Sequence, residues 1–209
     1  MEDVLELYAE PHDAARPVVC FDECGKELHG HVADPIPATP GHPAKEDYEY
    51  VRNGTANLFV IVEPLAGTRR VTVTDRRTIP DFAARMKYLC DVLYPAAAVI
   101  RVVLDNPNTH TLGSLFATDP PEEAWRLARR LESHDTPKHA SWLNMAECEL
   151  SVLARQCLNR RVPNKDGLTV EVAAWVAERN RVRAKIVWSF RVADARRKLD
   201  FLYPKELVR

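Results

Sequence analysis

Residues 17–23 read PVVCFDE and residues 98–105 read AVIRVVLD. Each is a short run of β-favouring apolar residues that stops at a carboxylate, which is typical of a buried strand followed by an acidic side chain. If the two strands are neighbours in one sheet, Asp22 and Asp105 lie side by side at its edge. Two like charges that close repel each other strongly, and a divalent cation relieves the repulsion. The pattern therefore predicts a metal site at a sheet edge.

The rest of the chain alternates between strand and helix patterns, which indicates an α/β fold. Thr78, Pro80 and Asp81 have the order of a helix start, with a hydroxyl cap, an early proline and an acid in the first turn. In chain order, the sequence predicts a strand over 18–22, a proline-rich loop over 33–47, a hairpin of strands over 58–63 and 70–74, a helix over 78–94, a strand over 98–104, a helix over about 119–131, a short strand over 132–135, a helix over 141–160 capped by Ser141, and two or three helices over 168–203.

The helix over 141–160 can supply a third carboxylate. Glu147 lies roughly 60° from the centre of its apolar stripe, and Glu149 lies roughly 100° away on the other side. Glu147 is therefore expected to lean over the sheet edge, whereas Glu149 is expected to face water. Carboxylates are hard oxygen ligands that suit Mg²⁺ or Mn²⁺. Three of them can hold two ions roughly 3.5–4 Å apart, the arrangement that serves in-line phosphoryl transfer.

Composition excludes several classes of protein. With 46% hydrophobic and 28% charged residues in 209, the chain has the make-up of an ordinary globular protein. It contains no glycine-rich nucleotide loop, no secretory signal and no apolar run that could span a bilayer. Five cysteines without a C-x-x-C pair indicate reduced thiols, so we expect a cytoplasmic protein without a zinc site.

Charge is distributed unevenly along the chain. The net charge is −1, but it divides into −9 over residues 1–50, 0 over 51–154 and +8 over 155–209. A basic C-terminal quarter is consistent with binding to nucleic acid. Solvated helix faces, with arginines paired to acids, are the alternative explanation.

The local sequence around the three acids resembles a known family. The blocks VCFDE over 19–23, VLDNPNTH over 103–110 and TPKHASWLNMAE over 136–147 resemble the signature blocks of DDE transposases. The branch they resemble is the bacterial relatives of mariner, called the IS six-thirty family. The stretches YEYVRNGTAN over 48–57 and AECELSVLARQCL over 146–158 are similar to connecting segments of that family.

This resemblance implies an RNase H-like fold, in which a central mixed five-stranded sheet is flanked by helices and followed by extra C-terminal helices. It also implies that Asp22, Asp105 and Glu147 are the catalytic residues and the ligands of two Mg²⁺ or Mn²⁺ ions. Asn106 and Asn144 are then expected to orient carboxylates, with capping of a strand end and a helix start as the alternative. The residues expected to contact DNA are Lys138, His139, Trp142, Arg155, Arg160 and Arg161, although packing is the commoner role of a tryptophan at a helix start such as Trp142.

The function implied is that of a transposase catalytic domain, which cleaves DNA at element ends and joins the freed 3′-hydroxyls to target DNA. The implied partner is double-stranded DNA, with a homodimer as the assembly, no membrane, and a place at the bacterial nucleoid. Two alternatives stay open: an RNase H-like nuclease without strand transfer, and an inactive remnant that binds DNA. Metal binding separates the last from the others.

Two departures from the family are visible. The 41 residues between Asp105 and Glu147 exceed the spacing in well-known mariner relatives, and we interpret the segment around 118–121 as an insertion. The chain also begins about 20 residues before Asp22, so a helix-turn-helix region is expected to be absent, and a separate polypeptide could supply it. We expect one catalytic domain over 1–209, with a core over about 16–160 and a helical extension over about 165–209.

Overall fold

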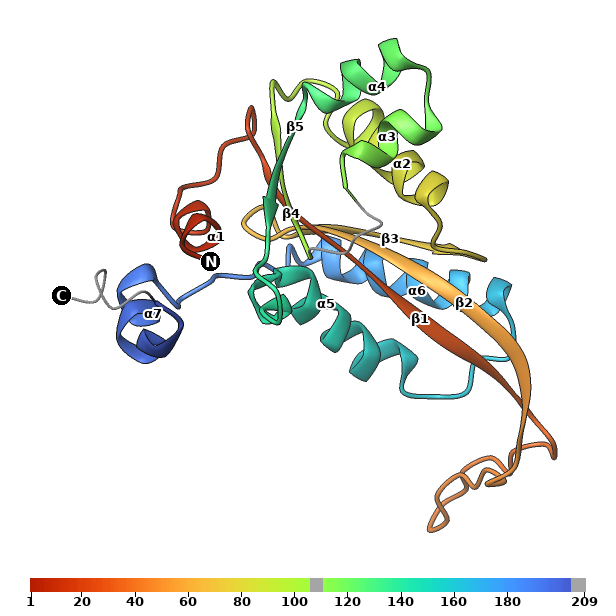
Figure 1. The fold of residues 1–209 in the computed structure, drawn as a ribbon. Coiled ribbons are helices and arrows are strands. Elements are labelled where there is room, and N and C mark those ends of the chain that lie inside the picture. Colours follow the sequence, from red (N-terminus) through yellow and green to blue (C-terminus); the bar gives the residue numbers. More distant parts are fainter. Residues whose placement is uncertain (106–110, 204–209) are drawn as a thin grey trace.

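A mixed five-stranded sheet forms the centre of the computed structural model, which describes residues 1–105 and 111–203 (Figure 1). The strand order is β3-β2-β1-β4-β5. The strands are β1 (Val18–His31), β2 (Tyr50–Glu63), β3 (Thr68–Thr74), β4 (Ile100–Leu104) and β5 (Leu131–Asp135). The first three form an antiparallel meander, and β4 and β5 add to β1 in parallel. This sheet and its flanking helices confirm the expected α/β architecture.

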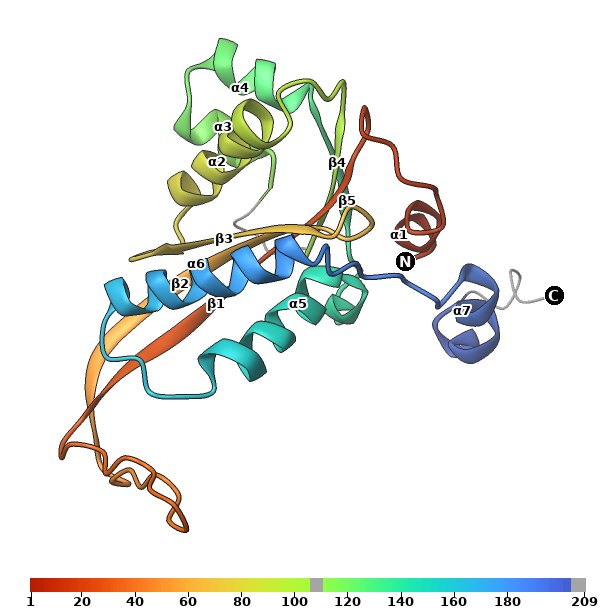
Figure 2. The ribbon, with the colours of Figure 1, turned by 180° about the vertical axis from the view of Figure 1, so that it is seen from behind.

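Helices cover both faces of the sheet. Figures 1 and 2 show α2, α3 and α4 on one face and α5 and α6 on the other. The helices are α1 (Glu2–Leu7), α2 (Ile79–Tyr88), α3 (Gly113–Thr118), α4 (Pro121–Ala128), α5 (Met145–Leu153), α6 (Lys165–Arg181) and α7 (Val192–Lys198), with π turns over Leu89–Leu93 and Ala154–Leu158 and 3₁₀ turns over Ser141–Leu143 and Asp200–Leu202. Since both faces are covered, the central strands are apolar on both sides.

Alternation along the strands sorts side chains between the two faces. Phe21 points toward α2, where it packs on Phe82 with the ring centroids 5.4 Å apart. Cys20 and Val103 lie in a different buried cluster, together with Ala146 of α5. Successive side chains of a strand point to opposite faces. Cys20 of β1 and Val103 of β4 therefore point to the side of the sheet on which α5 lies.

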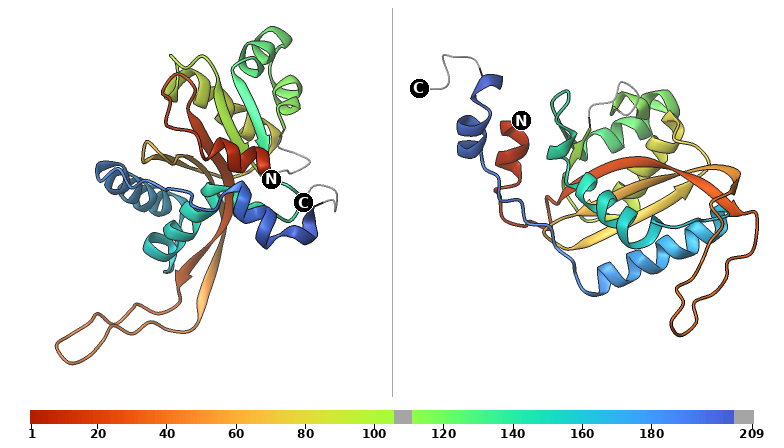
Figure 3. Two further views of the ribbon diagram at one scale, coloured as in Figure 1. Left: turned by 90° about the vertical axis from the view of Figure 1, so that its left-hand side faces the viewer. Right: turned by 90° about the horizontal axis from the view of Figure 1, so that it is seen from below.

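Several predicted elements are confirmed and others need correction. Thr78 caps α2 in a capping box with Asp81, as its sequence predicted. By contrast, β1 continues to His31, so Asp22 lies inside a strand and not beyond its end. Pairing with β2 sustains this extension, because antiparallel backbone bonds do not require apolar side chains. The two long strands form an arm that carries the loop over 32–49 away from the body (Figure 3).

The predicted helix over 141–160 is divided into three pieces. A 3₁₀ turn comes first, α5 follows, and the π turn over Ala154–Leu158 ends the segment. Asn144, and not Ser141, is the N-cap of α5, because its side chain accepts a hydrogen bond from the backbone of Ala146. Helices α1 and α3 were not predicted, since each has only six residues, which is too few to show a repeating apolar pattern.

No helix among the described residues has both the length and the apolar character needed to cross a bilayer.

Candidate metal centre

Strands β1 and β4 place two aspartates side by side. Phe21 of β1 is paired with Leu104 of β4 in parallel register, and Asp22 and Asp105 are the next residues along each chain. The alternation described above sends both carboxylates to the face that α5 covers. The predicted meeting of the two acids at one place in the sheet thus has a structural basis, although Asp22 comes from mid-strand.

Helix α5 begins beside these aspartates and carries Glu147 in its first turn. Its N-cap, Asn144, is fully buried and does two things at once. The Asn144 Nδ2 donates to the backbone oxygen of Phe21 at 2.8 Å and lies 3.5 Å from Oδ2 of Asp22. The Oδ1 accepts from Ala146 N at 3.1 Å. Both explanations offered for Asn144, carboxylate contact and helix capping, therefore apply.

The three carboxylates share one pocket. Asp22, Asp105 and Glu147 line a cavity of about 220 Å³ whose other lining residues are Phe21, Glu23, Arg77 and Leu104. Within residues 1–105 and 111–203, no three His, Cys, Asp or Glu side chains are already arranged as ligands around one metal position. The pocket therefore brings the three acids to one place, without a ready-made set of three ligands among the described residues.

Electrostatics in this pocket favour a cation. Burial, followed by repulsion from Glu147, Glu23 and Asp105, raises the pKa of Asp22 to about 7. Asp105 is held by Thr136, whose Oγ1 donates to its Oδ1 at 2.8 Å. Oxygen donors that repel one another fit the hard cations Mg²⁺ and Mn²⁺, since the ion replaces the repulsion with attraction. The residues present thus fit the expected metal.

Asp22→Asn should stabilise the metal-free protein at pH 8. Well below pH 4 the Asp22 carboxyl is protonated in both the folded and the unfolded protein. Between about pH 4 and 7 it is ionised in the unfolded chain but still protonated in the folded protein. The wild type therefore loses stability as the pH rises through this range. The amide removes this loss and should raise the free energy of unfolding by up to about 4 kcal/mol at pH 8, with little change at pH 4. Thermal melts in a chelator at both pH values test this. A lower melting temperature at pH 8 would contradict it.

The prediction that Glu149 faces water is wrong. Its side chain is only 1% exposed and forms ion pairs with Arg69 of β3 and Arg179 of α6. Arg179 donates from Nε and Nη2 to the two Glu149 oxygens, each at 3.0 Å. Burial lowers the pKa of Arg69, and the charge of Glu149 opposes this effect. Two arginines from β3 and α6 cover this face of α5 and make it a charged interior, which the sequence of the helix alone does not indicate.

The residues predicted to contact DNA lie in different settings. Lys138 and His139 are exposed in the turn between β5 and α5, where His139 adopts a positive φ of 64°. Trp142 is 43% exposed and packs against Trp188 and Phe190 of the C-terminal segment. Its packing is a fact of the structure, and its contact with DNA stays a prediction.

The three predicted arginines after α5 all have protein partners. Arg155 donates to Ser151 Oγ at 2.8 Å. Arg160 pairs with Glu171. Arg161 donates to backbone oxygens at the base of the loop over 32–49, including that of Glu49 at 2.9 Å. Asn106, the other predicted orienting residue, lies outside the described residues.

Sequence reasoning missed two residues at this centre. Thr136 was not singled out as the partner of Asp105, although it directly follows the predicted strand β5 next to β4. Arg77 was not singled out because it precedes the cap of α2, about 70 residues from Glu147 in sequence, and no local pattern links the two. Only the long-range pairing of β1, β2 and β3 places it at the pocket.

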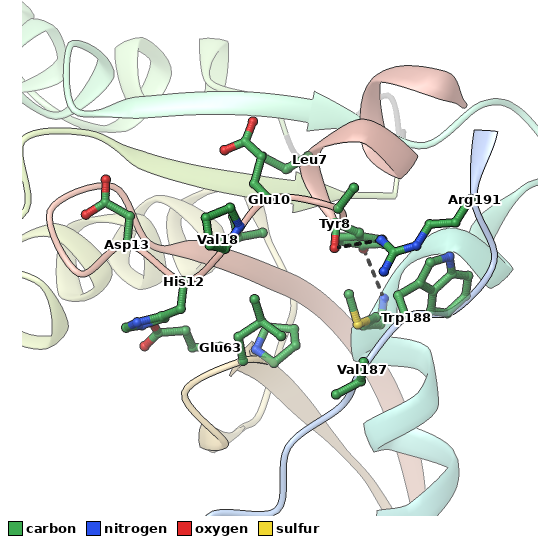
Figure 4. Close-up of a pocket in the computed structure, with 15 residues that line it drawn as sticks. Leu7, Tyr8, Glu10, His12, Asp13, Val18, Glu63, Val187, Trp188 and Arg191 are labelled. Atoms are coloured by element: carbon green, nitrogen blue, oxygen red, sulfur yellow. Dashed lines mark hydrogen bonds and ion pairs between the residues drawn. The ribbon is translucent and has the colours of Figure 1, made fainter. Parts of the chain in front are cut away.

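A second cavity, of about 140 Å³, lies between the N-terminal segment and the C-terminal segment and contains none of the predicted site residues (Figure 4). Tyr8 at its wall holds the start of α5. The Tyr8 hydroxyl donates to Leu143 O at 2.8 Å and accepts from Met145 N at 3.4 Å. The segment before the sheet thus fixes the beginning of the helix that carries Glu147.

Tyr8→Phe should lower the free energy of unfolding by about 1–2 kcal/mol, because Leu143 O and Met145 N lose their partner in a buried place. Chemical denaturation measures the change. Tyr48→Phe, at a tyrosine that is 86% exposed, is the matched control and should leave stability unchanged. Equal stability of both variants would show that the hydroxyl does not hold the helix start.

Comparisons with known proteins give a family for the chain and several similar folds. Residues 17–169 match a family model described as DDE superfamily endonuclease. The fold is similar to those of the Mos1 mariner paired end complex with Mn (TM-score 0.59, 14% identity, covering 87% of this chain and 54% of that chain) and the Mos1 strand transfer complex (0.59, 14%, 87% and 53%). A Mos1 transposase paired-end complex with the left transposon end is also similar, with a TM-score of 0.55 and 14% identity, covering 78% of this chain and 48% of that chain.

The fold is therefore of the RNase H-like class found in transposase catalytic domains. The chain belongs to the DDE superfamily of endonucleases, because the family model covers well over half of it. It spans about half the length of the Mos1 chains that it matches. A comparison with curated protein sequences gave no significant match.

Proposed function

We propose that this chain is the catalytic domain of a transposase of the mariner-like superfamily, in its IS six-thirty branch. The domain would cleave DNA at the ends of a mobile element and join the freed 3′-hydroxyls to target DNA. The observation that carries the proposal is the shared pocket of Asp22, Asp105 and Glu147 within a chain of the DDE superfamily.

Each residue of the centre has a role in this proposal. Asp22, Asp105 and Glu147 would hold two Mg²⁺ or Mn²⁺ ions. Asn144 would keep Asp22 in place, and Thr136 would keep Asp105 in place through the hydrogen bond to its Oδ1. When bound, such ions activate the attacking water or hydroxyl and neutralise charge on the phosphate. The side chains then have mainly to position the reacting groups.

The partners follow from the same proposal. Double-stranded DNA, as element ends and as target, would lie across the pocket, with Lys138 and His139 beside it. A homodimer would allow two ends to be processed together, and a helix-turn-helix region on this or another polypeptide would recognise them. We also propose that residues 1–209 act as one catalytic domain, in the cytoplasm at the nucleoid.

An oligonucleotide assay tests the proposal. The full chain is incubated with labelled duplex DNA and Mn²⁺, and both nicked and joined products are measured. Nicking with joining supports a transposase, whereas nicking alone indicates a nuclease without strand transfer. No nicking under any divalent cation, in a protein that is folded, would contradict the proposal.

A further inference from the structure

Arg77 lies in the wall of the carboxylate pocket. It belongs to the loop between β3 and α2 and lines the same cavity as Asp22, Asp105 and Glu147. It is the only basic residue among the described residues that line this pocket. A positively charged arginine among carboxylates, at a site proposed to act on a phosphodiester, needs a chemical explanation.

The loop that carries Arg77 is fixed at both ends. On one side, Thr74 Oγ1 donates to Arg76 O at 2.6 Å, and Asn57 Nδ2 donates to Asp75 O at 3.1 Å. On the other side, Thr78 N donates to Asp81 Oδ2 at 2.8 Å in the cap of α2. The backbone of Arg77 is therefore held in place between two anchored neighbours, which limits where its guanidinium can reach.

The guanidinium itself is available to a ligand. Arg77 is exposed and makes no ion pair with any residue of the described segments, despite the acids around it. Many other arginines of the chain are engaged, such as Arg126 with Asp91 and Arg196 with Glu2. A planar guanidinium presents paired donors that match two oxygens of a phosphate. It also keeps its charge at every relevant pH.

We propose that Arg77 binds a phosphate group of the DNA strand that lies at the carboxylate pocket. This inference rests on the proposed function and adds a substrate contact to it. With its backbone anchored, Arg77 would fix the strand by one charged contact. The carboxylates would be left to their cations, because the arginine neither pairs with them nor replaces an ion.

A DNA-binding measurement tests the inference apart from turnover. The full chain is titrated with fluorescein-labelled duplex DNA in Ca²⁺ at several salt concentrations, for the wild type, Arg77→Ala, Arg77→Lys and Arg76→Ala. Arg76 is the matched control, since it is the neighbouring exposed arginine and does not line the pocket. Thermal melts should show all four proteins equally stable, because both side chains are exposed.

Arg77→Ala should weaken DNA binding about tenfold. It should also make the negative slope of log affinity against log salt shallower by about 0.9, as expected for one lost phosphate contact. Arg77→Lys should keep the slope and lose part of the affinity, whereas Arg76→Ala should stay within about twofold of the wild type. Equal affinity and slope for Arg77→Ala and Arg76→Ala, in a chain that nicks DNA with Mn²⁺, would overturn the inference and leave the proposed function standing. A wild-type chain that neither binds nor nicks DNA would overturn both.

Discussion

Asp105→Asn and Glu147→Gln should each reduce Mn²⁺-dependent nicking by at least about a thousandfold. Each substitution removes one of the proposed charged oxygen ligands while keeping the size of the side chain, and an amide is a poor replacement where a divalent cation must be held. In Asp105→Asn the side-chain carboxamide oxygen can still accept the hydrogen bond from Thr136, so the side chain should keep its place in the fold. Initial nicking rates at saturating Mn²⁺ measure the effect.

Glu122→Gln is the matched control for this prediction. Glu122 is an exposed acid in the first turn of α4, outside the carboxylate pocket, and its substitution should leave the rate unchanged. Thermal melts show whether the variants are folded. Full activity in either Asp105→Asn or Glu147→Gln would exclude that residue as an essential metal ligand.

Glu149→Gln should lower the free energy of unfolding by about 3–5 kcal/mol. The substitution leaves Arg69, whose side chain is fully buried, without a compensating charge. Arg69 also donates to Gly67 O and Arg179 O, both at 2.9 Å, so it cannot turn away to solvent without breaking further bonds. Urea denaturation measures the loss. Glu149 ties α5 to β3 through Arg69 and to α6 through Arg179, so we expect the loss of stability to be large.

A double substitution separates charge from packing at this place. Glu149→Gln combined with Arg69→Met removes both buried charges and should recover part of the loss caused by Glu149→Gln alone, since an unpaired buried charge costs more than the carbonyl oxygens of Gly67 and Arg179 left without their donor. The exposed pair of Glu178 and Arg181 provides a control, and Glu178→Gln should change stability by less than about 0.5 kcal/mol. A loss of that small size for Glu149→Gln would contradict the role given to the buried pair.

Much of the sheet, and the pocket shared by three acids, could be predicted from local patterns. The apolar runs before Asp22 and Asp105 mark two buried strands, because a strand buried on both faces must be continuously apolar, and the pairing of β1 with β4 makes them neighbours. The cap of α2 was predictable because Thr78 and Asp81 interact across only three residues. Asp22 and Asp105 were singled out because each directly follows such a run, and Glu147 from its place on the helical wheel and from the family resemblance; the three line one pocket, and their role as metal ligands stays a prediction.

Features that depend on distant partners could not be predicted. Glu149 was placed in water because nothing near it in sequence indicates that Arg69 and Arg179 cover it. Strand β1 was cut short at Asp22 because its later residues are polar, and only the register with β2 shows that pairing continues. Arg77 was missed because no pattern near it in sequence links it to the acids of the pocket. Long-range charge compensation and antiparallel pairing leave almost no local trace in sequence.

Calorimetric titration of the full chain with Mn²⁺, in the absence of DNA, tests the central claim most directly. If Asp22, Asp105 and Glu147 together bind divalent cations, the wild type should show saturable binding that Asp105→Asn weakens strongly and Glu122→Gln does not. Identical Mn²⁺ binding by the wild type and Asp105→Asn, or none by either folded protein, would contradict the account.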